Sequence, residues 1–239
     1  SKNDWEGLVD VLGTAADRVS DPAIKIDLSL RAARVYEEKI GAPHRAFRSY
    51  ERILSVDPDN ELAATALIPI YEQEEKWNRL VGVLRILLRK HEGGGSPQGR
   101  VELLRKLTLL CLDKLRDGEL ALVHALEAFQ LDPTDRSIRE TLEQAAELSQ
   151  QYEQLVGAYQ EGLSKLTDPA ELTDLRRRLA QLYLGPLATP SAAIPYLRAV
   201  ADADSADSEA MEALDRIYRN EKDFESLKDV YLRRLKAEL

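Results

Sequence analysis

Few residues in this chain have the type and spacing of a catalytic or metal-binding set. The histidines His44, His91 and His124 are far apart in the sequence and share no metal-ligand spacing with the single cysteine, Cys111. His91 falls at a predicted helix end, where a cation suits the helix dipole. A nucleophilic Cys111 would need a histidine partner that this spacing does not supply. We therefore expect no catalytic residue, no metal site, no cofactor and no enzymatic activity.

Two further segments invite a phosphate-binding interpretation, and neither fits it. The run Gly93-Gly94-Gly95-Ser96 lacks the Lys-Ser/Thr of a phosphate loop and follows no predicted strand, so we interpret it as a flexible loop. The basic triplet 176–178 lies on a predicted helix that begins at Asp168-Pro169 and also carries Asp174. Ion pairing along that helix is therefore the favoured interpretation.

The composition limits the class of protein. The 239 residues are 44% apolar and 31% charged, which is neither a disordered nor a membrane composition. No apolar stretch approaches the ~20 residues that span a bilayer. The net charge of −9 argues against nucleic acid as a partner. We expect a cytoplasmic protein that does not insert into a membrane, and the excess of Arg over Lys, 22 to 11, suggests a bacterial source.

The chain repeats internally. Four segments open with an aromatic residue followed by a Leu three positions later, and their spacings are 72, 75 and 72: Trp5, Trp77, Tyr152 and Phe224. The first and third units keep one offset of 147 residues throughout, which pairs Asp21 with Asp168, Tyr36 with Tyr183, Ala46 with Ala193 and Tyr71 with Tyr218. This register predicts four-helix units at 5–76, 77–151 and 152–223, and a last helix at 224–239.

Apolar residues within each unit recur with the helical period of 3.6. Asp21-Pro22 reads as an N-cap followed by a first-turn proline, and Gly41 as a helix stop. Pro69 lies inside the fourth predicted helix, where we expect a kink or a local 3₁₀ or π turn. The pattern predicts 13 antiparallel helices and no sheet. Helix pairs that contact only their neighbours form a solenoid, so we expect one domain over 1–239, cut from a longer array.

These residues resemble the tetratricopeptide repeat (TPR), a helix–turn–helix of about 34 residues. Leu28, Ala33 and Tyr36 match its first helix, Ala46 and Tyr50 its second, and Pro58 its closing proline. The resemblance covers essentially the whole chain, with half-TPR or Sel1-like solenoids as the alternative. It implies an all-α, right-handed α-α superhelix. At the small positions Ala33, Ala46, Ala121, Ala180 and Ala193 we expect close, buried helix contacts.

The resemblance also implies that a concave groove, lined by the first helix of each pair, binds a peptide or a partner helix. Counting from the tyrosine position, the groove candidates include Leu30, Glu37, Thr65 and Leu112. The candidate partner-binding residues are all charged: Arg34, Arg105, Arg177, Arg216, Glu102, Glu140 and Asp174. The Lys and Asn clamp that some members use for a C-terminal carboxylate is absent.

Two partner chemistries fit these positions. Arg105, Arg177 and Arg216 could bind an acidic peptide, since Arg suits bidentate carboxylate recognition. The segments 5–76 and 152–223 each carry a net charge of −5, whereas 77–151 is neutral, and this acidity slightly favours a basic partner.

The function that follows is a protein–protein interaction scaffold or adaptor that binds a peptide segment or a partner protein. Two alternatives stay open: a regulatory solenoid that senses a peptide or a signal, and a subunit associated with an enzyme but without its own catalysis. The sequence indicates neither the partner nor the oligomeric state.

Overall fold

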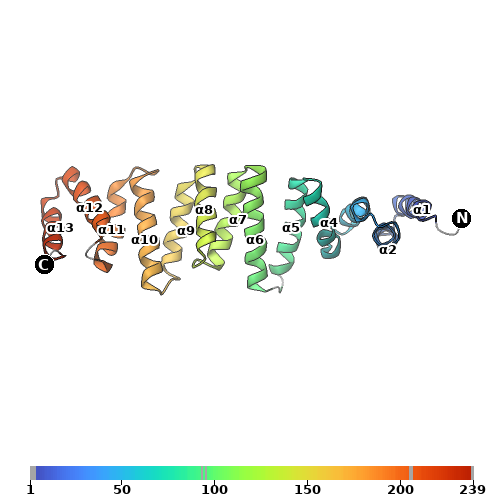
Figure 1. The fold of residues 1–239 in the computed structure, drawn as a ribbon, viewed down its shortest axis with the longest axis horizontal. Helices are drawn as coiled ribbons and strands as arrows, with labels where there is room; N and C mark the ends of the chain where they lie inside the picture. The colour runs from blue at the N-terminus through green and yellow to red at the C-terminus, as the bar shows by residue number, and fades with distance from the viewer. Residues whose placement is uncertain (1–3, 93, 95, 205–206, 238–239) are drawn as a thin grey trace. The chain divides into compact units, whose positions relative to one another are not determined.

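The computed structural model describes residues 4–92, 94, 96–204 and 207–237. Across these residues it contains 13 α-helices and no strand, which confirms the all-α prediction (Figure 1). The chain divides into two compact units, Ser1–Arg116 and Asp117–Leu239, whose boundary falls inside the predicted four-helix unit 77–151. The single domain, its division into four-helix units and the right-handed course of the array stay predictions.

Consecutive helices pack on one another in each unit. The first unit holds α1 (Trp5–Arg18), α2 (Pro22–Arg34), α3 (Phe47–Val56), α4 (Glu61–Gln73), α5 (Trp77–Glu92) and α6 (Pro97–Leu110). The second holds α7 (Gly118–Leu131), α8 (Arg136–Ser149), α9 (Tyr152–Leu163), α10 (Pro169–Leu184), α11 (Pro190–Ala203), α12 (Ser208–Glu221) and α13 (Phe224–Ala237). Each predicted opening aromatic therefore begins a helix, although Phe224 is 70% exposed whereas the other three are half-buried.

Short polar side chains start the helices where the sequence predicts. The Asp21 carboxylate accepts the Ala23 N–H at 2.8 Å, and its equivalent Asp168 accepts the Ala170 N–H at the same distance. Each is followed by a proline, whose missing N–H costs nothing in a first turn. Asn60 and Asp207 cap α4 and α12 in the same way.

Two π turns occur where no sequence signal predicted them. The turn η1 (Val35–Ile40) extends α2, and η3 (Cys111–Leu115) extends α6 at the equivalent place. Gly41 ends η1 with a φ of 71°, a left-handed conformation that glycine adopts without a steric cost, and Arg116 ends η3 with a φ of 54°. In each case a lysine from the π turn lies over the opening tryptophan of the preceding helix.

The prediction of a 3₁₀ or π turn at Pro69 is wrong. The α-helix α4 runs unbroken from Glu61 to Gln73 across this residue. Pro69 is exposed, and so is Thr65, the residue whose carbonyl would otherwise accept a bond from position 69. Water can therefore satisfy that carbonyl without a change of helix type.

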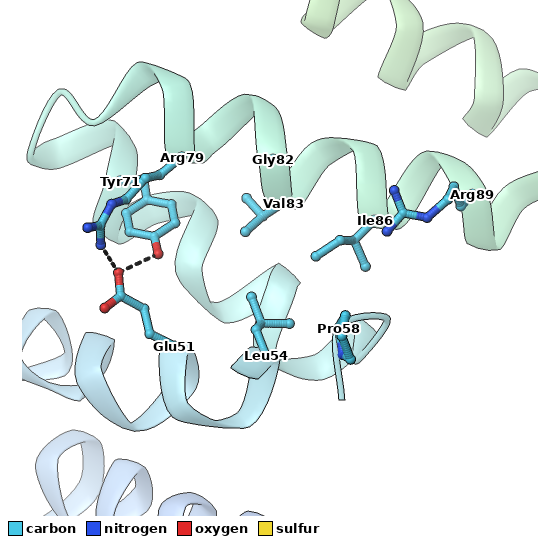
Figure 2. Close-up of a pocket in the computed structure, with 9 residues that line it drawn as sticks. All are labelled: Glu51, Leu54, Pro58, Tyr71, Arg79, Gly82, Val83, Ile86 and Arg89. Atoms are coloured by element: carbon cyan, nitrogen blue, oxygen red, sulfur yellow. Dashed lines mark hydrogen bonds and ion pairs between the residues drawn. The ribbon is translucent and has the colours of Figure 1, made fainter. Parts of the chain in front are cut away.

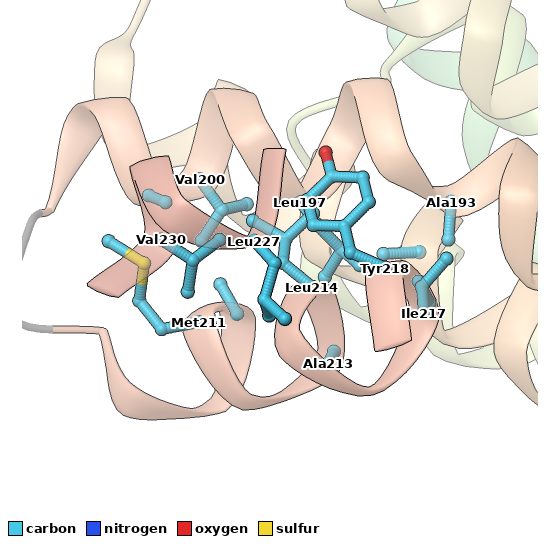
Figure 3. Close-up of a cluster of buried hydrophobic side chains, with 13 residues drawn as sticks. Ala193, Leu197, Val200, Met211, Ala213, Leu214, Ile217, Tyr218, Leu227 and Val230 are labelled. Atoms are coloured by element: carbon cyan, nitrogen blue, oxygen red, sulfur yellow. The ribbon is translucent and has the colours of Figure 1, made fainter. Parts of the chain in front are cut away.

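The small alanines lie at the helix contacts. Ala33, Ala46, Ala121, Ala180 and Ala193 are each at most 1% exposed, as predicted. Figure 3 shows one such contact, where Ala193, Leu197 and Val200 of α11 face side chains of α12 and α13. This cluster of buried side chains thus joins four consecutive helices, α10 to α13.

Candidate functional site

A cleft of about 740 Å³ opens beside α2 and α4 in the first unit. Leu30 and Arg34 of α2 line it together with Thr65 of α4 and Glu37 of η1, which are four of the residues that the repeat register assigned to the groove. The register therefore brings these four residues to one hollow. Asp27 and Glu72, which the register also assigned to the groove, are not among the lining residues. The buried Tyr50 of α3 also lines the cleft.

Further residues of the cleft were not predicted. They are Glu38, Glu61, Leu62 and Ala66. Three of them follow from the helical period, because Glu61 and Leu62 lie four and three residues before Thr65 on α4, and Ala66 lies four residues after Leu62. Glu38 lies in η1, and a π turn is not foreseen by counting in steps of 3.6 residues.

The cleft has an apolar floor and an acidic edge. Leu30, Leu62 and Ala66 supply the aliphatic surface, and Leu62 is 55% exposed. The hydroxyl of Tyr50 donates to Glu37 Oε1 at 2.6 Å. Burial of the Tyr50 ring, followed by the Glu37 carboxylate, raises the pKa of this phenol well above its usual value, so the hydroxyl stays a donor.

The other predicted partner-binding residues do not join this cleft. Glu102 is exposed on α6, where Arg105 is half-buried, and Arg216 is exposed on α12. Glu140 on α8 accepts from Arg136 at 2.8 Å along its own helix. Leu112 is only 5% exposed, so its assignment to the groove surface is wrong: it lies in η3, where the extra residue per turn rotates side chains away from the counted face.

Two arginines of the basic triplet of α10, Arg177 and Arg178, form ion pairs, and both reach other helices. Arg178 binds Asp174 at 2.9 Å within the helix, as predicted, and also Glu143 of α8 at 2.6 Å. Arg177 binds Asp207, the N-cap of α12, at 2.6 Å. Asp174 lies 3.6 Å from Arg139 as well. These charges hold adjacent helices together.

A second hollow of about 440 Å³ separates α3 from α5. Leu54, Val83 and Ile86 point into it from the two helices (Figure 2). At one end Glu51 accepts the Tyr71 hydroxyl at 2.9 Å and pairs with Arg79, and burial together with Glu51 raises the pKa of Tyr71 to about 12. Since these charges are paired with one another, we assign them a structural role.

The same three positions recur 147 residues later with altered charge. Arg198 replaces Glu51 and donates to the Tyr218 hydroxyl at 2.7 Å, and its other nitrogen donates to Ser226, which replaces Arg79, at 3.2 Å. The tyrosine at the centre is kept. This recurrence is direct structural support for the internal repeat.

The histidines and the cysteine lie apart from the cleft. Cys111 is a fully buried thiol, and His124 is buried in α7. His44 is exposed, and His91 Nδ1 lies 3.0 Å from the Leu87 carbonyl. Within the described ranges no cluster of three or more His, Cys, Asp or Glu side chains could hold a metal ion, and no described helix is long and apolar enough to cross a membrane.

Comparison with known proteins gives structural likenesses only. No family model matches the chain, and no curated protein does. A tetratricopeptide repeat protein from Parabacteroides merdae ATCC 43184 is 15% identical over 99% of this chain and 87% of its own, with a TM-score of 0.37. PilW, a widely conserved type IV pilus biogenesis factor, is 14% identical over 86% of this chain and 90% of its own, with a TM-score of 0.37.

A third likeness is to the APC/C hetero-tetramer Cut9-Hcn1, at 18% identity over 90% of this chain and 46% of that one, with a TM-score of 0.33. At these identities and scores the likenesses assign no function. The helix order and internal register of this chain are, by themselves, those of an all-α helical repeat.

Proposed function

We propose that this chain is a protein-interaction module without catalysis of its own, and that it binds a peptide segment of a partner protein in the α2–α4 cleft. The observation that carries the proposal is the cleft itself. It combines an aliphatic floor of Leu30, Leu62 and Ala66 with a rim of charged side chains. A buried apolar centre and a polar rim are the anatomy of protein interfaces.

The arrangement of the helices supports the same function. The residues that line the cleft come from α2, η1, α3 and α4, which the ordered packing of consecutive helices holds in place. A rigid, preformed surface loses little conformational entropy when a peptide binds. We also propose that the protein is located in the cytoplasm. Fractionation of cells that express the tagged protein tests this location.

A peptide-display selection on the immobilised chain tests the proposal. The selected peptides are synthesised, and their affinities are measured by fluorescence anisotropy for the native chain and for Thr65→Arg. Thr65 is exposed on the wall of the cleft, so a long side chain there fills the cleft without disturbing the core. We expect the affinity to fall by about tenfold or more, since displacing an apolar contact costs on the order of 1.4 kcal/mol.

The matched control is Val123→Arg on α7, which is 55% exposed and lies outside the cleft. It should leave the affinity unchanged. Peptides that bind Thr65→Arg as well as the native chain would contradict the α2–α4 cleft as the binding site.

A further inference from the structure

The charges around the α2–α4 cleft are unbalanced. Three carboxylates line it, those of Glu37, Glu38 and Glu61, and one guanidinium, that of Arg34. The surrounding segment 5–76 carries a net charge of −5, so the local imbalance and the regional charge have the same sign. A cation that enters the cleft is therefore attracted by both.

Two of the three carboxylates are available to a ligand. Glu38 and Glu61 are exposed, and in the part of the chain that the structure describes no Lys, Arg or His nitrogen lies within 4.0 Å of either. Glu37 is exposed as well, but its carboxylate accepts the Tyr50 hydroxyl at 2.6 Å, which fixes its position in the cleft lining. An entering cation thus meets two acceptors without an ion-pair partner among the described residues, Glu38 and Glu61, and a third, Glu37, that is already hydrogen-bonded.

Several other acids in this unit form ion pairs between elements. Glu6 pairs with Arg45 at 2.6 Å, Asp17 with Arg52 at 2.7 Å, and Glu72 with Lys106 at 2.7 Å. Each of these pairs joins two elements, so its carboxylate serves the packing of the helices. Glu38 and Glu61 form no such ion pair in the part of the chain that the structure describes, so their charge at the cleft is not neutralised by a basic side chain.

The aliphatic floor restricts the ligand further. A free metal ion or a simple polyamine would leave Leu30 and Leu62 in contact with water, whereas a peptide with an aliphatic side chain would cover them. Phosphate groups would be repelled by the three carboxylates, which argues against nucleic acid in this cleft. A peptide with basic side chains next to an aliphatic one would match both the aliphatic and the acidic side chains of the cleft.

We propose that the α2–α4 cleft binds a basic segment of a partner protein, with Leu, Ile or Val against Leu30, Leu62 and Ala66, and with Lys or Arg side chains on Glu38 and Glu61. This inference rests on the proposed function, because it names the chemistry of the peptide in the same cleft. Since exposed ion pairs mainly set specificity and association rate, binding should weaken as salt is added.

The test uses a dodecamer display library on the full chain, followed by anisotropy titrations with the selected peptides. The variant Glu38→Lys with Glu61→Lys reverses the two open charges. Its matched control is Glu119→Lys with Glu153→Lys, two exposed carboxylates on α7 and α9 that lie outside the cleft. Both double variants change the net charge equally, so a difference between them reports the place of the charge. Circular dichroism confirms that each variant keeps its helices.

We expect the native chain to select peptides with Lys or Arg beside an aliphatic residue, and the cleft variant to lose about tenfold or more in affinity for them while the control loses far less. Selection of neutral or acidic peptides, or equal losses in the two double variants, would overturn the inference. If such peptides are still blocked by Thr65→Arg, the proposed function stands and only the basic partner is rejected. If no selected peptide is sensitive to Thr65→Arg, both fail.

Discussion

Ala193 shows how a single side chain sets the distance between two helices. It is fully buried in the cluster that joins α11 to α12 and α13. Replacing it with Phe introduces a ring where no space exists, so we expect Ala193→Phe to lower the free energy of unfolding by roughly 1–3 kcal/mol. Urea unfolding followed by circular dichroism measures this. The exposed Ala170→Phe on α10 is the control, and equal stabilities of the two variants would contradict the assigned contact.

Two glycines should respond to alanine with opposite signs. A Cβ on Gly118 would lie 2.7 Å from the Ser149 nitrogen, whereas a Cβ on Gly82, inside α5, would meet nothing within 4 Å. We expect Gly118→Ala to destabilise the chain by about 1–3 kcal/mol because the backbone of α8 must move. Gly82→Ala should stabilise it by about 0.5–1 kcal/mol because alanine restricts the unfolded chain. Thermal unfolding compares them, and a shift in the same direction would refute the prediction.

The residue scale separates what the sequence reveals from what it does not. The five contact alanines were predicted because the repeat register marks two small positions, one that is alanine in all three units and one that is alanine in the first and third. The close approach at Gly118 was not, since it depends on where the end of α8 lies. The triplet at 176–178 divides in the same way: the Arg178–Asp174 pair follows from a spacing of four residues, but the partner of Arg177 is Asp207, 30 residues later.

Asp207 links two elements, because it caps α12 and binds Arg177 of α10. Its burial raises the pKa of the carboxyl, but the Ala210 N–H and Arg177 outweigh that effect and hold the pKa below its ordinary value of 3.8. A lowered pKa means that the carboxylate stabilises the fold at neutral pH and loses this contribution as the pH falls below the ordinary value.

We therefore expect Asp207→Asn to flatten the acid dependence of stability. Asparagine is still a good N-cap, so the fold should persist, but it does not titrate. The free energy of unfolding should fall less steeply below about pH 4 in the variant than in the native chain. Urea titrations at successive pH values measure the two slopes. The exposed Asp10→Asn on α1 serves as the control, and identical slopes for Asp207→Asn and the native chain would count against the prediction.

At the scale of elements, helix starts were predictable and helix ends were less so. Aspartate followed by proline marks the starts of α2 and α10, because the cap and the fixed φ act locally. The π turns at the ends of α2 and α6 have no comparable residue signature. The cleft shows the consequence: Glu37 was assigned to it, whereas Glu38, one residue further along the π turn, was not.

For the whole molecule, stability should be local. Consecutive helices pack on one another, and the chain forms two compact units, so the loss of a contact in one unit should be felt mainly by its neighbours. The fully buried Leu67 of α4 provides the test. Leu67→Ala should cost about 2–5 kcal/mol locally and speed amide exchange in α2 to α5 more than in α11 to α13.

Hydrogen exchange with mass spectrometry measures this pattern, and Leu214→Ala in α12 should reverse it. A uniform increase along the chain in either variant would show a single cooperative unit instead. The sequence predicted the array but not the boundary near Arg116. A repeat register predicts the same helix contacts in every unit. The boundary between compact units depends instead on how closely particular helices pack, which the register does not indicate.

The two equivalent sets of side chains around Tyr71 and Tyr218 also limit how this gene could be rearranged. Units that share a register are natural partners for unequal crossing-over. An exchange that joined Arg198 to the segment carrying Tyr71 and Arg79 would place two cations around one hydroxyl, and the reciprocal product would leave Glu51 beside Ser226. Crossovers at the turns before α3 and α11 would keep each set whole. The charges around the two equivalent tyrosines thus disfavour crossovers within these three-helix segments. Crossovers that exchange whole segments keep each set of charges matched.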